Sequence, residues 1–530
     1  MNIVAVVYAD LRQDFYGAPG RLGEDLAGEP VLTRTLQRLA AVKGLGGIAL
    51  AAPGEQIRRV AGMAGNVRVR LFEHDRPLSP TLRALRAARA FGRYGWRGGL
   101  AGTTIFDEMF DVPLLATAIQ AMGADSLLLV PAGAALLDVQ WTSDLLAYHA
   151  EHVEQYRMAF NQAPPGLCGG VFSASLLTDL GEKQVYPGKL LAYDPQNVMQ
   201  DPIAAGYNLT LPQWLVATPR RFIADNPRGL WLCRKIVEQA GPDVDGQTAC
   251  RIAQTLPPEP WPREVTIELT TRRPIEDDLR PAAQRGDLPL PALEASLAGL
   301  EEAGDVNVML AGVGDALLHP HWPEAVALAK RVGQVGLATY GTTMDLQVGG
   351  RLASAGVDLL QVNVDAVSDT LYAMHKRGGS ASDVWENIRG LLLNCSASGL
   401  TTPMVIPAML KTRQSLDEQD EFFEKCLVTN GWGLIIEPTT AGGQWPDRAV
   451  VHMAPPARGP CRRILNRLTL LSDGQVTACE EDLHGAHRLV ESNILAAWRG
   501  EGLSSLRRLH AESRWAEHPL CKACQEFHRP

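Results

Sequence analysis

The sequence predicts an α/β protein in which two blocks of alternating strands and helices are followed by a small cysteine-bearing cap. Three observations support this prediction. Apolar segments of strand length alternate with segments of helical periodicity near the N-terminus, and the alternation restarts at Val265. The chain has 530 residues, too many for one hydrophobic core, so several domains are expected. Four of the nine cysteines lie close to the C-terminus.

The first block, residues 1–185, is expected to form a doubly wound domain. Apolar strand-like segments at 2–10 and 46–53 flank a helical pattern at 30–42. Strand, helix and strand in that order imply a parallel sheet. Residues 186–260 lose this pattern and are rich in Pro, Asp and Asn, so we expect a connector with one small helical element.

The second block, residues 261–455, is expected to form a parallel (β/α)6 barrel, complete or open. It contains six apolar segments of strand length, separated by helical patterns, which together make six β/α steps. These strand-like segments are 265–269, 306–312, 335–341, 359–366, 401–408 and 433–438. Residues 456–530 lose the alternation and form the predicted cap.

Composition and charge exclude some classes of function. The net charge of −9 and scattered arginines argue against nucleic-acid binding, which needs dense Lys/Arg patches. The most apolar stretch, 126–139, is short and broken by Pro and Gly, so no membrane span is expected. Residues 1–10 lack the features of a signal peptide, so a cytoplasmic location is expected.

The four C-terminal cysteines are predicted to form one metal site. Cys521 and Cys524 make a CxxC pair, which places two thiolates about one turn apart. Cys461 and Cys479 supply two more, and Gly474 allows a tight hairpin turn before Cys479. Four thiolates suit either zinc or one iron–sulfur cluster, and geometry alone does not choose. The other five cysteines are isolated, as buried inert thiols usually are.

Residues 461–527 resemble the C-terminal SPASM extension of radical S-adenosylmethionine (SAM) enzymes. The shared pattern is a Cys, then Gly-x4-Cys from Gly474 to Cys479, then an Asn-Ile/Trp stretch at Asn493, Ile494 and Trp498, then CxxC. The full family pattern carries more cysteines and two auxiliary clusters. With four cysteines, this segment resembles the reduced form, which implies one [4Fe-4S] cluster.

The barrel block resembles the same family. The stretch "VMLAGVGDALLHP" is similar to the Gly-Gly-Glu-Pro segment that receives the methionyl amino group of SAM. Gly312, Gly314 and Asp315 occupy those positions, and Asp365 matches an Asp that often lies near the ribose. The resemblance therefore implies SAM contacts at these four residues.

The loop after the first barrel strand departs from the family pattern. Family members carry Cys-x3-Cys-x2-Cys there, but this sequence has Arg273 at the first position and no cysteine between Cys250 and Cys395. Residues 272–281 offer cations and carboxylates, which suit an anionic ligand or a salt-bridged plug over the barrel mouth. Such groups do not replace soft thiolates on iron, so the machinery that cleaves SAM is expected to be missing.

The N-terminal block resembles nucleotide-sugar and sialic-acid cytidylyltransferases. Pro19, Gly20 and Arg21 match their Pro-Gly-Lys loop, which implies that Arg21 contacts nucleotide phosphates. Gly133 stands where those enzymes carry a metal-binding Asp, which argues against nucleotidyl transfer. The domain order resembles the architecture called spiro-SPASM.

Taken together, these resemblances imply a binding or accessory protein of the radical SAM/SPASM type that has lost SAM cleavage and holds one C-terminal [4Fe-4S] cluster. Zinc is the alternative metal, and SAM is a further candidate ligand. A small molecule, a peptide or a protein is the expected partner. Two alternatives remain: a modifying enzyme acting on a peptide, protein or nucleoside-sugar substrate, and a nucleotidyltransferase.

Overall fold

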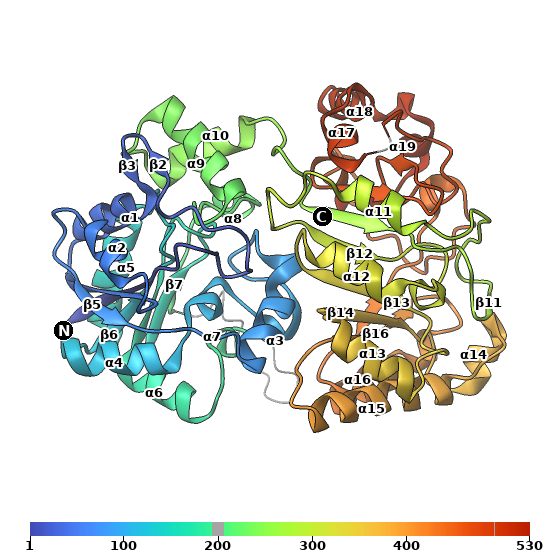
Figure 1. Cartoon of the computed structure of the whole chain (residues 1–530), viewed down its shortest axis with the longest axis horizontal. Helices are drawn as coiled ribbons and strands as arrows, with labels where there is room; N and C mark the ends of the chain where they lie inside the picture. The colour runs from blue at the N-terminus through green and yellow to red at the C-terminus, as the bar shows by residue number, and fades with distance from the viewer. Residues whose placement is uncertain (193–205, 492, 530) are drawn as a thin grey trace. The chain divides into compact units, whose positions relative to one another are not determined.

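The computed structural model describes residues 1–192, 206–491 and 493–529. The chain divides into two compact units, and we describe each by itself (Figure 1). The first unit contains residues 1–79 and 88–259, and the second contains residues 80–87 and 260–530.

The first unit is built on a seven-stranded sheet. Its strand order is β5 (Arg70–Glu73), β4 (Leu45–Ala52), β1 (Ile3–Tyr8), β6 (Ser126–Leu129), β8 (Gly170–Ser173), β7 (Met158–Asn161) and β9 (Asn208–Leu209). The first four strands in this order are parallel, as the sequence predicts. Strand β8 runs antiparallel to both of its neighbours, so the sheet is mixed rather than wholly parallel.

Alternate side chains of β1 enter two separate cores, which makes this unit a three-layer structure. Ala5 and Val7 pack in one core with apolar residues of α1 (Val31–Ala40), α5 (Val139–His152), α9 (Pro227–Ala240) and α10 (Gly246–Thr255). Val4 and Val6 pack on the other face with α4 (Val112–Met122) and α6 (Ala174–Glu182). Residues 206–259, expected as a connector, contribute β9, α9 and α10 to this unit. The smaller elements are β2 (Asp25–Leu26), β3 (Glu29–Pro30), α2 (Ile57–Gly62), α7 (Pro187–Leu190) and α8 (Gln213–Val216).

The second unit is built on an eight-stranded sheet. Its order is β17 (Leu434–Ile436), β16 (Met404–Leu410), β14 (Leu359–Asn363), β13 (Val335–Thr339), β12 (Asn307–Leu310), β10 (Glu264–Ile267), β18 (Arg467–Leu470) and β19 (Val476–Thr477). The six strands from β10 to β17 are parallel and follow chain order, which confirms the six predicted β/α steps. The C-terminal segment adds β18 parallel to β10, and β19 antiparallel to β18.

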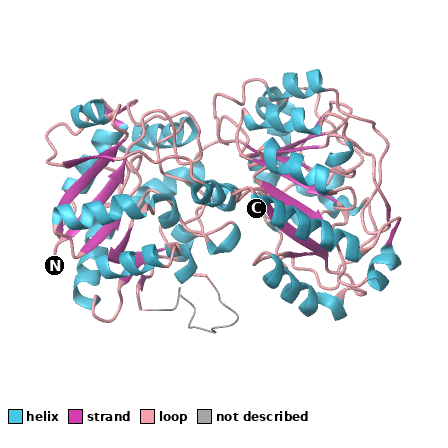
Figure 2. Cartoon of the chain, turned by 60° about the horizontal axis from the view of Figure 1, so that its bottom comes forward, coloured by secondary structure: helices cyan, strands magenta, loops and turns pink. Residues whose placement is uncertain are grey.

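The two faces of this sheet differ in chemistry. Val265 and Ile267 of β10 and Val362 of β14 belong to the apolar core of this unit. Figure 2 shows helices packed along the strands of the sheet. The alternate residues of the same strands, Gln361 and Asn363 of β14 among them, line a cavity on the opposite face. The flanking helices include α11 (Leu290–Leu297), α12 (Trp322–Lys330), α13 (Leu346–Ala355), α14 (Asp369–His375), α15 (Ala381–Ala397) and α16 (Gln419–Thr429). Helix α3 (Pro80–Arg89) begins in the segment assigned to this unit.

The C-terminal part of this unit carries the predicted hairpin and three short helices. Gly474 has a φ of 81°, and Leu471 N–H donates to the carbonyl of Gln475 at 2.8 Å, closing the turn between β18 and β19. The helices are α17 (Ile494–Arg499), α18 (Glu501–Ala511) and α19 (Pro519–Ala523). Within the described residues, no helix is both long and apolar enough to span a membrane.

Candidate functional site

The four C-terminal cysteines line one cavity of about 310 Å³, which we call the cysteine cavity. Cys461 precedes a short 3₁₀ turn, Cys479 follows β19, Cys521 lies in α19 and Cys524 ends that helix. Cys461 and Cys479 are buried, and the other two are half-buried. The structure thus brings together thiols that are up to 63 positions apart in sequence, Cys461 and Cys524.

Backbone N–H groups support two of these sulfurs. Glu481 N–H donates to Cys479 Sγ at 3.5 Å, and Glu526 N–H donates to Cys524 Sγ at 3.3 Å. Each donor lies two residues after the cysteine it contacts. Such N–H donors stabilise negative charge on sulfur, as the ligands of iron–sulfur clusters require.

Burial disfavours the charged form of three of the four thiols, Cys479, Cys521 and Cys524. Burial, followed by the nearby Cys461 and Cys524, raises the pKa of Cys521 to about 12. Burial raises the pKa of Cys524 to about 11 and that of Cys479 well above its usual range. Among the described residues, no three His, Cys, Asp or Glu side chains converge closely enough to hold a single metal ion.

The loop after β10 is closed by ion pairs within the fold. Arg280 pairs with Asp365 at 2.5 Å and with Asp277 at 3.1 Å, and Lys376 contacts Asp365 at 2.6 Å. Strand β11 (Glu276–Asp277) pairs with β15 (Lys376–Arg377), which holds the loop against the segment that follows β14. We call Asp277, Arg280, Asp365 and Lys376 the plug.

Other cations of this loop also have partners inside the fold. Arg285 pairs with the buried carboxylate of Glu268 at 2.8 Å. Arg273 donates to the carbonyls of Val313 at 2.6 Å and Arg280 at 3.1 Å. The structure shows the salt-bridged arrangement. An anionic ligand at this loop stays a prediction.

Asp365 is fully engaged by its neighbours. Burial alone would raise its pKa, but Arg280 and then Lys376 outweigh burial and hold the pKa well below its usual range. Leu410 N–H also donates to its Oδ1 at 2.9 Å. Its carboxylate is therefore occupied by partners within the fold. A contact of Asp365 with a ribose stays a prediction.

The segment after β12 packs closely onto the loop after β10. A Cβ on Gly314 would lie 2.3 Å from the carbonyl oxygen of Thr270, and one on Gly312 would lie 2.7 Å from Glu268 Cγ. Asp315 is fully buried and accepts hydrogen bonds from Thr339 Oγ1 and Tyr340 N–H, both at 2.9 Å. Burial raises the pKa of Asp315, and its carboxylate ties the ends of β12 and β13 together.

A second cavity of about 310 Å³ lies on the polar face of the sheet, and we call it the sheet cavity. Gly312 lines it, whereas Gly314, Asp315 and Asp365 are not among its lining residues. Charged side chains from the C-terminal segment complete its wall: Glu437, Arg463, Glu480, Glu481, Asp482, Glu526 and Arg529.

The middle of the second unit matches a known family. Residues 281–409 match the model of the radical SAM superfamily. This segment is a radical SAM superfamily domain. It covers β12, β13, β14 and most of β16, whose carboxyl ends line the sheet cavity.

Two curated relatives show limited similarity. An uncharacterized protein of Treponema pallidum is 25% identical over 128 residues, covering 23% of this chain and 34% of that protein. A GTP 3′,8-cyclase of Mycobacterium ulcerans is 27% identical over 252 residues, covering 37% of this chain and 68% of the cyclase. The chain therefore spans about a third of the length of the first of these relatives.

Two solved structures show a loose likeness, with TM-scores below 0.5. Streptococcus suis SuiB bound to the precursor peptide SuiA has a TM-score of 0.42 at 12% identity, covering 67% of this chain and 85% of SuiB. A cytidylyltransferase from Leptospira borgpetersenii has a TM-score of 0.32 at 12% identity, covering 48% of this chain and 97% of that enzyme.

Sequence reasoning missed the charged wall between the radical SAM domain and the cysteines. Glu481 and Glu526 each follow a cysteine by two positions, so a repeated Cys-x-Glu spacing was present in the sequence. Arg463 contacts Glu481 at 2.6 Å and Glu526 at 3.8 Å. Arg463 thereby joins two segments that the sequence separates by 45 residues, Glu481 and Glu526.

Outside the radical SAM domain, the structure places Arg21 on a closely packed loop of the first unit. A Cβ on Gly20 would lie 2.6 Å from the carbonyl oxygen of Leu11. Arg21 N–H donates to the carbonyl of Asp225 at 2.9 Å, and its guanidinium pairs with Glu24 at 3.5 Å. A Cβ on Gly133 would lie 2.7 Å from the amide nitrogen of Asp225. The backbone at Asp225 therefore packs directly against the segment that follows β6.

Proposed function

We propose that this chain is a radical SAM/SPASM-type iron–sulfur protein that binds a ligand but does not cleave SAM. In this proposal the cysteine cavity holds one [4Fe-4S] cluster. Four soft donors, two N–H···S contacts and room for several water molecules support a group larger than one ion. Zinc is the alternative occupant, but as a single ion it would need the thiols to converge more closely than they do among the described residues.

In this proposal, binding of the cluster to the cysteines is coupled to the release of protons from the thiols. Because burial raises the pKa of Cys479, Cys521 and Cys524, each must lose a proton when it becomes a ligand. Glu481 and Glu526 then hold two of the resulting thiolates through their backbone N–H groups. When bound, the cluster would supply one-electron transfer.

The plug is the observation that carries the loss of SAM cleavage. That reaction needs an iron with an open coordination position, which three protein thiolates leave free and four do not. The loop that supplies three thiolates in the family instead places Arg280 in contact with Asp277 and Asp365. Its cations and carboxylates neutralise one another and offer no soft ligand.

We propose the sheet cavity as the ligand site for a small molecule or a peptide. Gln361 and Asn363 give it a polar floor, and Glu437 holds a buried Oε1 without a hydrogen-bond partner in the described chain. A buried acceptor in that state is costly unless a ligand or water satisfies it. Glu437 would therefore bind a hydrogen-bond donor of the ligand. SAM remains a candidate ligand, held non-productively, with Gly312 in the wall.

The first unit is proposed to bind a nucleotide without transferring it. The Arg21 guanidinium is 36% exposed and its pair with Glu24 is exposed and weak, which leaves it accessible to a phosphate. A titration with CTP, comparing the wild type with Arg21→Ala, measures this contact. Affinity that is equal in both proteins would remove Arg21 from the site.

The central experiment measures metal content and SAM cleavage on one anaerobic preparation. We expect about four irons and four sulfides per chain, following from one [4Fe-4S] cluster. After reduction with dithionite in excess SAM, mass spectrometry should find no 5′-deoxyadenosine above background. Double replacement Cys521→Ser and Cys524→Ser should abolish the iron, because two of four ligands are lost.

The matched control is Cys395→Ser with Cys426→Ser, which removes two buried thiols outside the cysteine cavity. This control should keep its iron. Zinc in place of iron would contradict the cluster assignment. Sustained 5′-deoxyadenosine production that is lost in the control pair would show that another set of thiols initiates the radical.

A further inference from the structure

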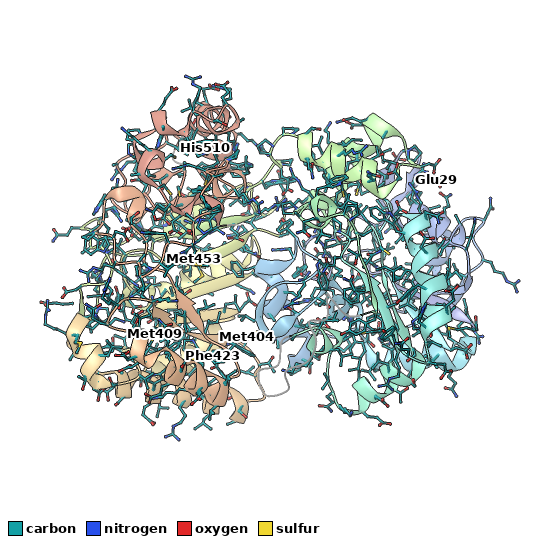
Figure 3. The ribbon with its side chains drawn as sticks, turned by 180° about the vertical axis from the view of Figure 1, so that it is seen from behind. Glu29, Met404, Met409, Phe423, Met453 and His510 are labelled. Carbon is teal, nitrogen blue, oxygen red and sulfur yellow. The ribbon has the colours of Figure 1, made fainter. Side chains whose placement is uncertain are left out.

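His510 lies on α18 and lines the cysteine cavity with the four proposed ligands. Figure 3 labels it among the C-terminal helices. Its side chain is almost completely buried, with 2% exposure. It lies 49 residues after Cys461, so its position in the sequence does not relate it to the cysteine motif.

One hydrogen bond fixes the tautomer of His510. The backbone N–H of Cys461 donates to His510 Nδ1 at 3.1 Å. A ring nitrogen that accepts must carry a lone pair, so the imidazole proton resides on Nε2. The contact also links α18 directly to one of the cysteines.

The other ring nitrogen, Nε2, carries an N–H donor that has no acceptor among the described residues. His510 Nε2 is buried and has no hydrogen-bond partner in the described part of the chain. A buried N–H in this state destabilises the fold until an acceptor satisfies it. The acceptors that this cavity would contain, once loaded, are the sulfurs of a cluster and its cysteine ligands.

We propose that His510 Nε2–H donates a hydrogen bond to a sulfur of the cluster and raises its reduction potential. The inference rests on the proposed function. Two of the four cysteine sulfurs, Cys479 Sγ and Cys524 Sγ, already receive backbone N–H donors. The His510 donor adds a side-chain contact that reduced clusters, being more negative, accept more strongly than oxidised ones.

His518 lines the same cavity but does not carry the same argument. Its Nδ1 is buried and lacks a partner among the described residues, and its ring lies 4.7 Å from that of His487. No hydrogen bond in the described chain fixes which of its nitrogens holds the proton. The inference is therefore confined to His510.

Two substitutions separate the donor from the structural contact. In His510→Asn, the amide oxygen can replace Nδ1 as acceptor for Cys461 N–H, but nothing replaces Nε2–H. In His510→Gln, the amide N–H reaches the position of Nε2 and keeps the donor. The matched control is His484→Asn, because His484 is exposed and does not line the cavity.

The test is a redox titration of the anaerobic full-length protein followed by electron paramagnetic resonance. At the wild-type midpoint, H510N should show an oxidised-to-reduced ratio about tenfold higher, a shift of about 59 mV to lower potential for one electron. H510Q and H484N should stay near the wild type. In the wild type labelled with ¹⁵N-histidine, the resonance spectrum of the reduced cluster should contain a hyperfine coupling to one histidine N–H proton. Exchange into D₂O should remove this coupling.

The outcomes distinguish this inference from the proposed function. A wild type that holds a cluster whose potential is unchanged in H510N overturns the inference and leaves the proposed function standing. A wild type that holds no iron overturns both. If H510N fails to fold, the hyperfine measurement on the wild type decides: absence of an exchangeable histidine coupling overturns the inference.

Discussion

At the scale of single residues, burial has placed a titratable group where its charge is costly. His149 on α5 is 1% exposed, and its Nε2 lies 2.9 Å from Ser126 Oγ on β6. Burial lowers its pKa from 6.5 to about 4. The unfolded chain therefore binds a proton at higher pH than the folded one, so the stabilisation is complete above pH 6.5 and is lost as pH falls through 4.

His149→Gln keeps an amide near the position of Nε2 but removes the titration. We expect the acid-induced loss of unfolding free energy between pH 7 and 4.5 to shrink by about 2 kcal/mol. Urea unfolding of the first unit at these two pH values measures it. His484→Gln, which alters an exposed histidine, should leave the pH dependence as in the wild type. An equal pH dependence in His149→Gln would contradict the assignment.

At the scale of elements, the plug holds the loop after β10 against the segment that follows β14. Asp365 and Lys376 have side chains exposed by 3% and 1%, so removing the carboxylate leaves Lys376 buried without this partner and leaves Arg280 paired with Asp277 alone. Asp365→Asn should cost about 3–5 kcal/mol of unfolding free energy in the second unit. Asn tolerates the φ of 62° at this position, so the change isolates the charge.

An exposed ion pair of the same loop supplies the control. Arg272 and Asp287 pair at 2.9 Å with side chains exposed by 52% and 34%. Asp287→Asn should therefore cost less than about 1 kcal/mol. Chemical denaturation of both variants gives the comparison, and similar costs for the two would show that the plug does not hold the loop.

At the scale of the whole molecule, separate cores predict separate unfolding. The second unit has its own apolar core, and the first unit has two cores on the faces of its sheet. We expect two calorimetric transitions, because multidomain chains depart from two-state behaviour. Double replacement Cys521→Ser and Cys524→Ser should lower only one of them, by about 2–4 °C for each kcal/mol of stabilisation lost.

That transition should be the one that belongs to the second unit. Asp365→Asn identifies it independently, since the plug lies in that unit. A single transition, or a shift of both transitions on removal of the thiols, would contradict the independent unfolding of the two units.

Much of the architecture was predictable because it depends on local patterns. The six β/α steps of the second unit follow from apolar segments of strand length between helical patterns, and the structure confirms their parallel order. The mixed sheet of the first unit was not predicted. The direction of β8 depends on how a short loop returns the chain, which periodicity does not encode.

The sequence by itself determined the four thiols and the absence of a thiol triad after β10, because ligand type and spacing are local properties. The tertiary structure alone decided what the neighbouring residues do. Asp365 meets Arg280 across 85 positions, and His510 meets Cys461 across 49. Whether a carboxylate or an imidazole is paired, buried or left with a free N–H depends on contacts between distant segments, and only the fold creates those contacts.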